Sequence, residues 1–298
     1  EKIFPTRVEP QTKSDVKVEL YKAEVRHKAK LKVAKPRVFI PVFPGTNCEH
    51  ESARCWRYAG AKPVELVVRN LTPTAIEETV AAFVDEIRNS QIIMIPGGFS
   101  AGDEPDGSGK FIAAMFSNPR IAEEVAQFLQ RDGLILGICN GFQALIRLGL
   151  LPYGEIRTLD KDSPELKYNT IGRHVSRMVR TRVTSNLSPW LSGNAVGDVH
   201  TIAVSHGEGR FFANDEWLKK LAANGQIATQ YVDFDGTPTD KIPFNPNGSA
   251  WAIEGITDIS GKIFGKMGHS ERIGEYVAKN IDGNKNQQLF EAGVEYFN

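Results

Sequence analysis

The sequence has few cysteines, no net charge and no long hydrophobic run. Its 298 residues include only three cysteines, Cys48, Cys55 and Cys139. Three cysteines are too few, and odd in number, for a disulfide framework, which favours a reducing, cytoplasmic setting. Lys plus Arg (36) equals Asp plus Glu (36), and no apolar run reaches the about 18 residues that a membrane helix needs. We therefore expect no nucleic-acid partner and no membrane partner, and we expect small-molecule chemistry instead.

The first 36 residues differ in charge from the rest of the chain. They carry ten Lys or Arg against five Asp or Glu, whereas the following residues carry 26 basic and 31 acidic groups. This contrast predicts a linker or the tail of an upstream region over residues 1–36 and one domain over residues 37–298. A plain solvated extension explains the charge run equally well. Because the chain opens with Glu1 instead of Met, we expect it to be a piece of a longer protein.

Short apolar segments alternate with helical stretches between Arg37 and about Leu150. The expected strands are rich in β-branched residues and bounded by Gly or Pro, and they cover 38–43, 64–68, 92–95 and 134–138. The expected helices cover 47–60, 73–88 behind a Thr72 cap, 109–131, and a stretch from just after Cys139 to about Leu148. This alternation predicts βαβ units and a parallel sheet, in which functional residues gather at the carboxyl ends of the strands.

Beyond Leu150 the alternation is lost. Further apolar runs predict additional strands, some of them antiparallel, at 177–183, 200–204, 227–232, 250–256 and 263–267. A final helix is predicted over 270–280. The predicted fold is therefore α/β, with a mostly parallel central sheet, helices on both faces and additional antiparallel strands.

The strongest local motif is Gly137-Ile138-Cys139-Asn140-Gly141, between an expected strand and an expected helix. Glycines on both sides of a nucleophile permit the tight turn that exposes its side chain at the sheet edge. The N-terminus of the following helix favours a thiolate. We interpret Cys139 as a nucleophile. A buried structural cysteine is the alternative and the commoner role for a free cysteine, but the flanking glycines and the strand-turn-helix context argue against it.

A thiol nucleophile needs an imidazole that accepts its proton and a carboxylate that orients the imidazole. Two His-x-Glu segments offer both groups, His206 with Glu208 and His269 with Glu271. Residues i and i+2 of an extended chain project to the same side, so either pair could place its two groups together. The residue types alone therefore make the two pairs nearly equal candidates. We favour the second pair, because an expected strand precedes it and an expected helix follows it. Glycines flank Glu208, which favours a loop that contacts ligand.

A glycine-rich turn, Pro96-Gly97-Gly98-Phe99-Ser100-Ala101-Gly102-Asp103, follows the expected strand at 92–95. Backbone amides in such a turn can donate to a developing oxyanion, together with the amide of Asn140. A phosphate-binding loop is the rival interpretation. It fails on spacing, because Glu104 and Phe111 stand where Gly and Ser or Thr are needed around Gly109-Lys110. An ordinary surface turn is the remaining alternative.

The first expected strand ends at Pro44-Gly45-Thr46-Asn47-Cys48-Glu49, which faces the same edge of the sheet. Nearby, Cys48, His50 and Cys55 are metal-ligand residue types. Their spacing matches no usual zinc pattern and no second ligand pair follows, so we predict no metal site.

Five motifs, taken in order along the chain, resemble those of a known enzyme family. They are Pro44–Glu49 (PGTNCE), Pro96–Asp103 (PGGFSAGD), Gly137–Gln143 (GICNGFQ), Ser205–Arg210 (SHGEGR) and Gly268–Arg272 (GHSER). The chain thereby resembles class I (triad) glutamine amidotransferases, and within them the glutaminase domain of phosphoribosylformylglycinamidine synthase of the large single-chain type. The resemblance covers about residues 24 to 297 and implies the flavodoxin-like fold of that class.

The resemblance also implies roles for individual residues. Cys139 would attack the side-chain amide of L-glutamine and form a glutamyl thioester, with His269 as general acid and base and Glu271 orienting it. Gly98 and Asn140 would form the oxyanion hole. The expected substrate contacts are Gly97, Phe99, Gln143, His206 and Glu208.

A partner follows from the same resemblance, namely a synthetase region of the same full-length polypeptide. That region would use ATP and Mg²⁺ to convert formylglycinamide ribonucleotide to its amidine in de novo purine biosynthesis, and no cofactor is expected in this chain. One departure from the family pattern is Ser270, where many shorter relatives have Pro. The glutaminase component of another amidotransferase, a thiol hydrolase on the same fold and a module that has lost its chemistry are alternatives. The match at Gln143 and the two glycine-rich motifs argue against a thiol hydrolase. The presence of Cys139, His269 and Glu271 argues against a module that has lost its chemistry.

Overall fold

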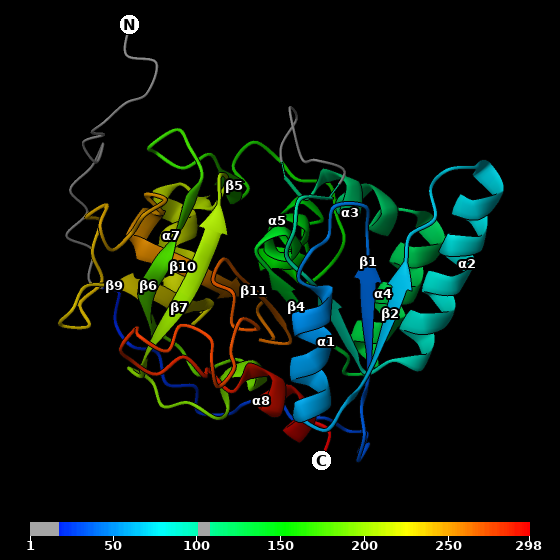
Figure 1. The fold of residues 1–298 in the computed structure, drawn as a ribbon, viewed down its shortest axis with the longest axis horizontal. Helices are drawn as coiled ribbons and strands as arrows, with labels where there is room; N and C mark the ends of the chain where they lie inside the picture. The colour runs from blue at the N-terminus through cyan, green and yellow to red at the C-terminus, as the bar shows by residue number, and fades with distance from the viewer. Residues whose placement is uncertain (1–17, 101–107) are drawn as a thin grey trace, which may run out of the picture.

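A nine-stranded sheet forms the centre of the protein (Figure 1). The computed structural model describes residues 18–100 and 108–298. In spatial order the strands are β2 (Lys62–Val67), β1 (Arg37–Val42), β3 (Ile92–Ile95), β4 (Leu134–Ile138), β11 (Ile263–Lys266), β10 (Ile253–Thr257), β9 (Ile227–Val232), β6 (Val175–Val183) and β7 (Val199–His206). Pairings from β2 to β11 are parallel, and we call these strands the parallel half. Pairings from β11 to β7 are antiparallel, and β10, β9, β6 and β7 are the antiparallel half.

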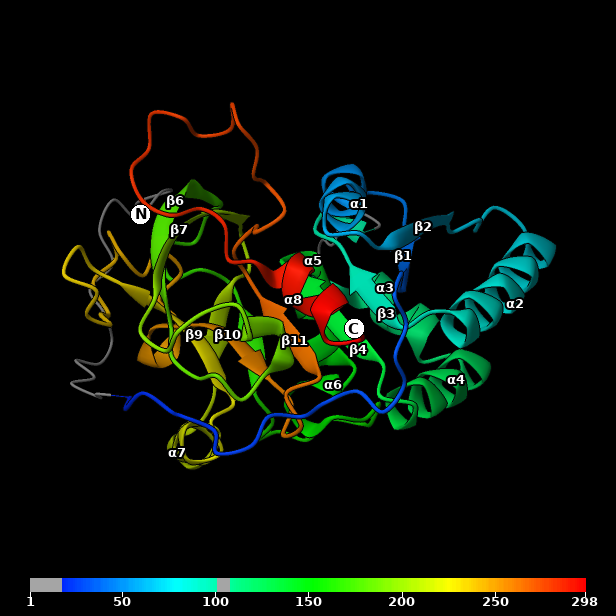
Figure 2. The ribbon, with the colours of Figure 1, turned by 90° about the horizontal axis from the view of Figure 1, so that it is seen from below.

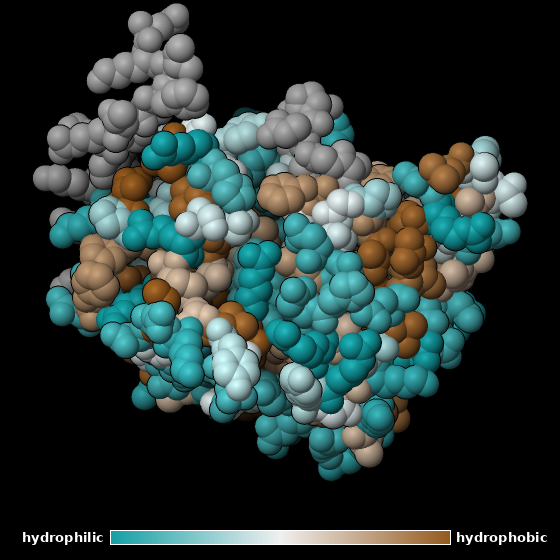
Figure 3. Space-filling view, in the orientation of Figure 1, coloured by the Kyte–Doolittle hydropathy of each residue, from teal (hydrophilic) through white to brown (hydrophobic). Residues whose placement is uncertain are grey.

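The parallel half confirms the strand predictions for the first 150 residues. Every residue of β3 and β4 is buried, as expected for short apolar strands covered on both faces. Strand β2 lies at the edge and is only partly buried. Most of the face in Figure 3 is hydrophilic, and apolar residues gather on the side of the molecule where Figure 1 places β2 and α2 (Pro73–Asn89).

Helices cover both faces of the parallel half (Figure 2). On one face, Trp56 of α1 (Glu49–Tyr58) packs edge-on against Phe290 of α8 (Leu289–Glu295), with ring centroids 5.0 Å apart. On the other face, Phe83 of α2 packs against Phe39 of β1, also at 5.0 Å. That second face also carries α3 (Lys110–Phe116), α4 (Pro119–Gln130) and α5 (Asn140–Arg147). The predicted α/β fold with helices on both faces is therefore confirmed.

Two of the predicted helices can be compared at their ends. Thr72 caps α2 as predicted, because its side chain accepts a hydrogen bond of 3.1 Å from the Ala75 N–H. The single helix predicted over 109–131 is wrong, since the chain forms α3 and α4. Asn118 caps α4 by accepting from the Arg120 N–H, and Pro119 occupies the first turn, where proline starts a helix and cannot continue one.

The antiparallel half confirms the strands predicted at 177–183, 200–204 and 227–232, and β11 of the parallel half confirms the strand predicted at 263–267. The segment 250–256 divides into a 3-10 turn, η3 (Ala250–Ala252), and β10. Among the described residues, six elements have no counterpart in the sequence-based prediction: α6 (Leu150–Tyr153), β5 (Glu165–Lys167), η2 (Pro189–Leu191), β8 (Arg210–Phe212), α7 (Asp215–Ala223) and α8. Strands β5 and β8 pair antiparallel as a separate small sheet.

The helix predicted over 270–280 is wrong. This segment forms isolated turns, in which the Val277 N–H donates to the Gly274 carbonyl and the Ile281 N–H donates to the Ala278 carbonyl. Tyr276 is 77% exposed, so the segment lacks the buried apolar face that stabilises most helices in proteins. The last helix of the described chain is α8.

Residues 18–36 run along the outside of the domain before entering β1. Figure 2 shows this segment, in blue, passing α7 and continuing along the lower edge of the view. Hydrogen bonds join it to the domain, from the Tyr21 N–H to the Thr184 carbonyl (2.9 Å) and from the Val33 N–H to the Phe297 carbonyl (2.7 Å). The rest of the predicted linker, residues 1–17, lies outside the described residues. The boundary at residue 36 stays a prediction.

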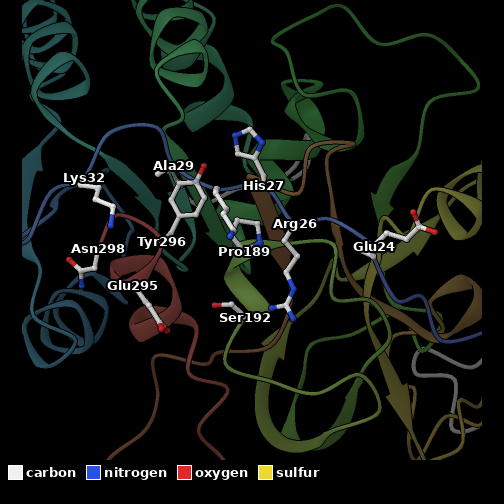
Figure 4. Close-up of a pocket in the computed structure, with 12 residues that line it drawn as sticks. Glu24, Arg26, His27, Ala29, Lys32, Pro189, Ser192, Glu295, Tyr296 and Asn298 are labelled. Atoms are coloured by element: carbon white, nitrogen blue, oxygen red, sulfur yellow. The ribbon is translucent and has the colours of Figure 1, made fainter.

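A cavity of about 610 Å³ lies between this segment and α8 (Figure 4). Its lining includes Arg26, His27 and Lys32 from the segment and Tyr296 from the C-terminal end. None of the site residues predicted from the sequence lines it. Within the described residues, no helix has the length and apolar character that crossing a bilayer requires.

Candidate active site

Cys139 stands at the turn between β4 and α5. Its φ of 53° and ψ of −105° place a non-glycine residue in a strained region of backbone conformation. A Cβ on Gly141 would overlap the carbonyl oxygen of Ile95, and a Cβ on Gly137 would lie 2.8 Å from the backbone of Gly141. The two glycines therefore permit β3, β4 and α5 to approach closely, and the resulting turn has the shape of a nucleophile elbow.

His269 and Glu271 follow the end of β11 and are both buried. The Nδ1 of His269 lies 2.6 Å from a carboxylate oxygen of Glu271, and the His269 N–H donates to the Ala203 carbonyl of β7. Burial opposes protonation of the imidazole, but the charge of Glu271 and the neighbouring Cys139 outweigh it and hold the pKa of His269 well above its ordinary value. Burial alone would raise the pKa of Glu271, yet His269 lowers it. The pair is thus a charge-assisted hydrogen bond.

Gly97 lies next to both the imidazole of His269 and the side chain of Cys139. A Cβ at this glycine would lie 2.8 Å from Cε1 of His269 and 3.4 Å from Cβ of Cys139. Within the described residues, Nε2 of His269 has no hydrogen-bond partner. The absence of a side chain at Gly97 leaves the imidazole and the thiol beside each other.

The other His-x-Glu pair has a different arrangement. Nδ1 of His206 lies 3.2 Å from the side-chain oxygen of Asn169, and the carboxylate of Glu208 accepts from the Ser108 N–H at 2.7 Å. Burial, together with the charges of His269 and His174, lowers the pKa of His206 to about 3. This imidazole is therefore neutral and held by an amide, and no carboxylate among the described residues bonds to it.

The glycine-rich turn lies against the end of β1. The Asn47 N–H donates to the Gly97 carbonyl (3.2 Å), and the Phe99 N–H donates to the Gly45 carbonyl (2.9 Å). These bonds do not use the Gly98 N–H. Gly98 has a φ of 146°, and a Cβ there would lie 2.6 Å from the Gly45 carbonyl oxygen, so only glycine fits.

The described ring contact of Phe99 is with His174. Phe99 is 45% exposed, and its ring lies near that of His174, with centroids 6.1 Å apart. The predicted remainder of this motif, residues 101–103, lies outside the described residues.

Asn140 and Gln143 are buried on the first turns of α5. The Asn140 side chain accepts from the Ser100 N–H (3.2 Å) and donates to the side-chain oxygen of Gln143 (3.0 Å). The Gln143 amide donates to the Glu208 carbonyl at 2.6 Å. Gln143 also borders a cavity of about 330 Å³ that neither Cys139 nor His269 lines. Gln143 therefore links α5 to the segment that contains Glu208.

Cys48 is a site residue that sequence reasoning did not assign to the site. Its Sγ lies 3.8 Å from Nδ1 of His269 and accepts from the Arg272 guanidinium at 3.3 Å. The signal was present, because the motif that contains Cys48 ends β1 at the same edge of the sheet.

Cys48 also belongs to a group of metal-ligand atoms. One ligand atom each from Cys48, His269 and Glu271 lie within 4.8 Å of one another. In this group His269 and Glu271 already bond to each other, and the thiol has the guanidinium of Arg272 as partner. Cys48, His50 and Cys55, the three residues considered from the sequence, do not form such a group among the described residues, and the side chain of His50 is 85% exposed.

Comparison with known proteins shows the family of this chain. Residues 35–297 match the model of the CobB/CobQ-like glutamine amidotransferase domain. The PurQ subunit of phosphoribosylformylglycinamidine synthase from Methanococcus maripaludis (strain C7) is 34% identical over 283 residues, which cover 88% of this chain and 98% of the relative. The PurQ subunit from Symbiobacterium thermophilum is 35% identical over 263 residues, which cover 87% and 96%.

Solved structures are also similar. A chain in the structure of PurLQS from Thermotoga maritima has a TM-score of 0.64 and 27% identity, covering 89% of this chain and all of that chain. A putative GMP synthase subunit from Thermoplasma acidophilum, at 12% identity and a TM-score of 0.50, shares the fold alone. From the matched family model and these relatives, this chain belongs to the CobB/CobQ-like glutamine amidotransferase family.

Proposed function

We propose that this chain hydrolyses L-glutamine to glutamate and ammonia through a triad of Cys139, His269 and Glu271. The observation that carries the proposal is the buried 2.6 Å hydrogen bond between His269 and Glu271, placed beside the elbow cysteine across Gly97. In this arrangement one imidazole nitrogen is fixed by a carboxylate and the other is available to the thiol.

In the first half-reaction, the Sγ of Cys139 attacks the side-chain amide carbon of glutamine while its proton passes to Nε2 of His269. The amide N–H groups of Gly98 and Asn140 hold the oxyanion that forms. The tetrahedral intermediate collapses when the C–N bond breaks and His269 gives its proton to the departing nitrogen. Ammonia leaves, and the glutamyl group remains on Cys139 as a thioester.

In the second half-reaction, His269 accepts a proton from water, whose oxygen attacks the thioester carbon. The C–S bond breaks, His269 returns its proton to the Sγ of Cys139, and glutamate is released. Glu271 stabilises the imidazolium in both halves through Nδ1, which agrees with the raised pKa of His269.

The substrate contacts of this proposal are Gly97, Phe99, Gln143, His206 and Glu208. Gln143 is best supported, because it is buried one turn beyond the nucleophile. Phe99 and His206 have weaker support, since the described contacts of Phe99 are with Gly45 and His174, and His206 binds Asn169. No cofactor or metal takes part in the proposed reaction.

We further propose that the ammonia serves phosphoribosylformylglycinamidine synthase, whose synthetase component uses ATP and Mg²⁺. The support is the name of the relatives that this chain covers almost from end to end. Those relatives are separate subunits, so they give no support to a synthetase region in the same polypeptide. The fused arrangement and a cytoplasmic location stay predictions. We also expect the isolated chain to bind glutamine but to turn it over slowly.

Labelling with a diazo-ketone analogue of glutamine tests the proposal. The chain is incubated with the analogue, alone and together with the synthetase component, and the adduct is located by mass spectrometry. We expect one adduct, on Cys139, that excess glutamine blocks. Cys139→Ala should remove both the adduct and the release of ammonia.

Cys55→Ala is the matched control. Burial and the charge of Glu271 raise the pKa of Cys55 to about 11, so its thiol is unreactive and the variant should label as the wild type does. An adduct on Cys48 in place of Cys139, or no adduct even with the synthetase component present, would contradict the proposal.

A further inference from the structure

A fully buried ion pair contacts the residues next to His269, the candidate base. Nζ of Lys266, the last residue of β11, is 3.2 Å from a carboxylate oxygen of Glu254 on β10. Both side chains have no exposed surface. Burying two charges is costly unless further hydrogen bonds satisfy them, so their remaining partners are informative.

One of those partners is Thr229 of β9, whose hydroxyl donates to a Glu254 carboxylate oxygen at 2.5 Å, and the others are the residues on either side of His269. Glu254 accepts from the Gly268 N–H at 2.6 Å, while Lys266 donates to the Gly268 carbonyl and to the Ser270 hydroxyl, both at 2.9 Å. The Ser270 hydroxyl then donates to the side chain of Gln287 at 2.6 Å. The pair therefore holds both polar groups of the Gly268 backbone and the side chain that follows the imidazole.

Gly268 is shaped for this contact. A Cβ there would lie 2.9 Å from the Glu254 carboxylate and 3.0 Å from Nζ of Lys266. The main chain of Lys266 also accepts from the Cys139 N–H at 2.8 Å. One residue thus holds the nucleophile through its carbonyl and the base segment through its ammonium group.

We propose that Lys266 and Glu254 are positioning residues that set the His269 imidazole against Glu271 and Cys139. The catalytic part of this proposal rests on the proposed function of His269. The geometric part, that the pair holds the imidazole in its hydrogen bond with Glu271, does not depend on glutamine.

The competing role for the pair is stability alone, and a double variant separates the two roles. Lys266→Met by itself would leave the buried Glu254 charge unpaired and would unfold the protein more easily for that reason. Lys266→Met combined with Glu254→Gln removes both charges at similar volume, so the unfolding midpoint should return toward the wild-type value. The double variant still lacks the ammonium that holds Gly268 and Ser270.

The first measurement is proton NMR of the imidazole in the short hydrogen bond to Glu271. Such a proton resonates downfield of the amide protons, and its absence in His269→Asn assigns it. We expect the resonance to shift or broaden in the double variant and to stay in place in Lys262→Met. That control removes a largely buried lysine paired with Asp132 immediately before the same strand.

The second measurement is steady-state glutaminase activity of the chain with its synthetase component. Misplacing a catalytic group costs turnover more than ground-state binding, so we expect kcat to fall about ten-fold in the double variant, with KM for glutamine changed less than about two-fold. Lys262→Met should keep both values.

The outcomes are distinct. An unchanged resonance in a folded double variant would overturn the proposal whatever the activity. A wild-type chain that releases no ammonia would remove the proposed function and the catalytic part with it, and the resonance would still decide the geometric part. If the double variant does not fold, Ser270→Ala, which removes only the hydroxyl that joins Lys266 to Gln287, replaces it with the same expected shift.

Discussion

The two halves of the sheet hold their shares of the candidate site by different means. In the parallel half, backbone holds Cys139, through a positive φ and through glycines that let β3, β4 and α5 touch. His269 follows β11, the strand at which the parallel half meets the antiparallel half, and side chains hold it, because Lys266 of β11 and Glu254 of β10 bind the residues on either side of it. The nucleophile thus depends on close packing of main chain, and the base depends on a buried polar network.

This difference implies different weaknesses. Close packing fails when a single methyl group is added, since main-chain atoms have no space to move into. A buried polar network fails when one partner is removed or when a proton is added, since the remaining group loses its compensation. Substitutions that add a methyl group can therefore test the main-chain packing, and changes of pH or of a polar side chain can test the buried polar groups.

The largest effect is expected from Gly141→Ala in the parallel half. Its Cβ would overlap the carbonyl oxygen of Ile95, which lies in a fully buried strand. We expect the free energy of unfolding to fall by about 3 kcal/mol or more, measured by denaturant titration. Gly207→Ala is the control, because no atom lies within 4 Å of a Cβ there, and it should change stability by less than about 0.5 kcal/mol. Equal stability of the two variants would show that main-chain packing does not hold the elbow.

The same contrast explains which parts of the fold could be predicted from the sequence. The elbow glycines, the first four strands and the Thr72 cap depend on neighbours along the chain, so local patterns indicate them. The predicted helix over 109–131 failed at Asn118-Pro119, where proline and a capping side chain outweigh a continuous apolar pattern. The helix predicted over 270–280 failed because the segment has no apolar face to bury.

The candidate site divides in the same way. Cys139 and the glycine-rich turn could be identified from motifs, but His206 and His269 could not be separated by residue type. What separates them is their partners, Asn169 for one and Glu271 for the other. Of the two reasons for favouring His269, the strand before it is present as β11, but the helix after it was wrong. The segment that contains His269 is held instead by Lys266 and Glu254. No local sequence pattern predicts this ion pair, because the pairing of β10 with β11 brings its two residues together.

A smaller effect is expected from His206→Asn in the antiparallel half. The pKa of His206 is lowered to about 3 in the folded protein, against about 6.5 in an unfolded chain. Between these values the unfolded chain binds a proton that the folded protein does not, so stability falls as the pH drops below about 6.5. The cost accumulates to about 2 kcal/mol between pH 7 and pH 5. His206→Asn should lose that much less stability over the same interval.

Denaturant titrations at pH 7 and pH 5 measure this difference. His50→Asn is the control, because its side chain is 85% exposed and the variant should keep the pH dependence of the wild type. If His206→Asn loses as much stability as the wild type between the two pH values, then the imidazole is protonated in the folded state, and burial does not hold it neutral.

The smallest effect is expected from Thr72→Ala, at a helix that packs on the parallel half. The Thr72 hydroxyl accepts from the Ala75 N–H at 3.1 Å, and an N-cap of this kind contributes about 1 kcal/mol, so the free energy of unfolding should fall by that amount. Thr74→Ala lies in the same first turn, is exposed and removes no cap, and it should cause no loss, since alanine favours helix. Equal stability of the two variants would mean that packing of Phe83 and its neighbours fixes α2 without its cap, and that local signals in the parallel half mark where elements begin without stabilising them.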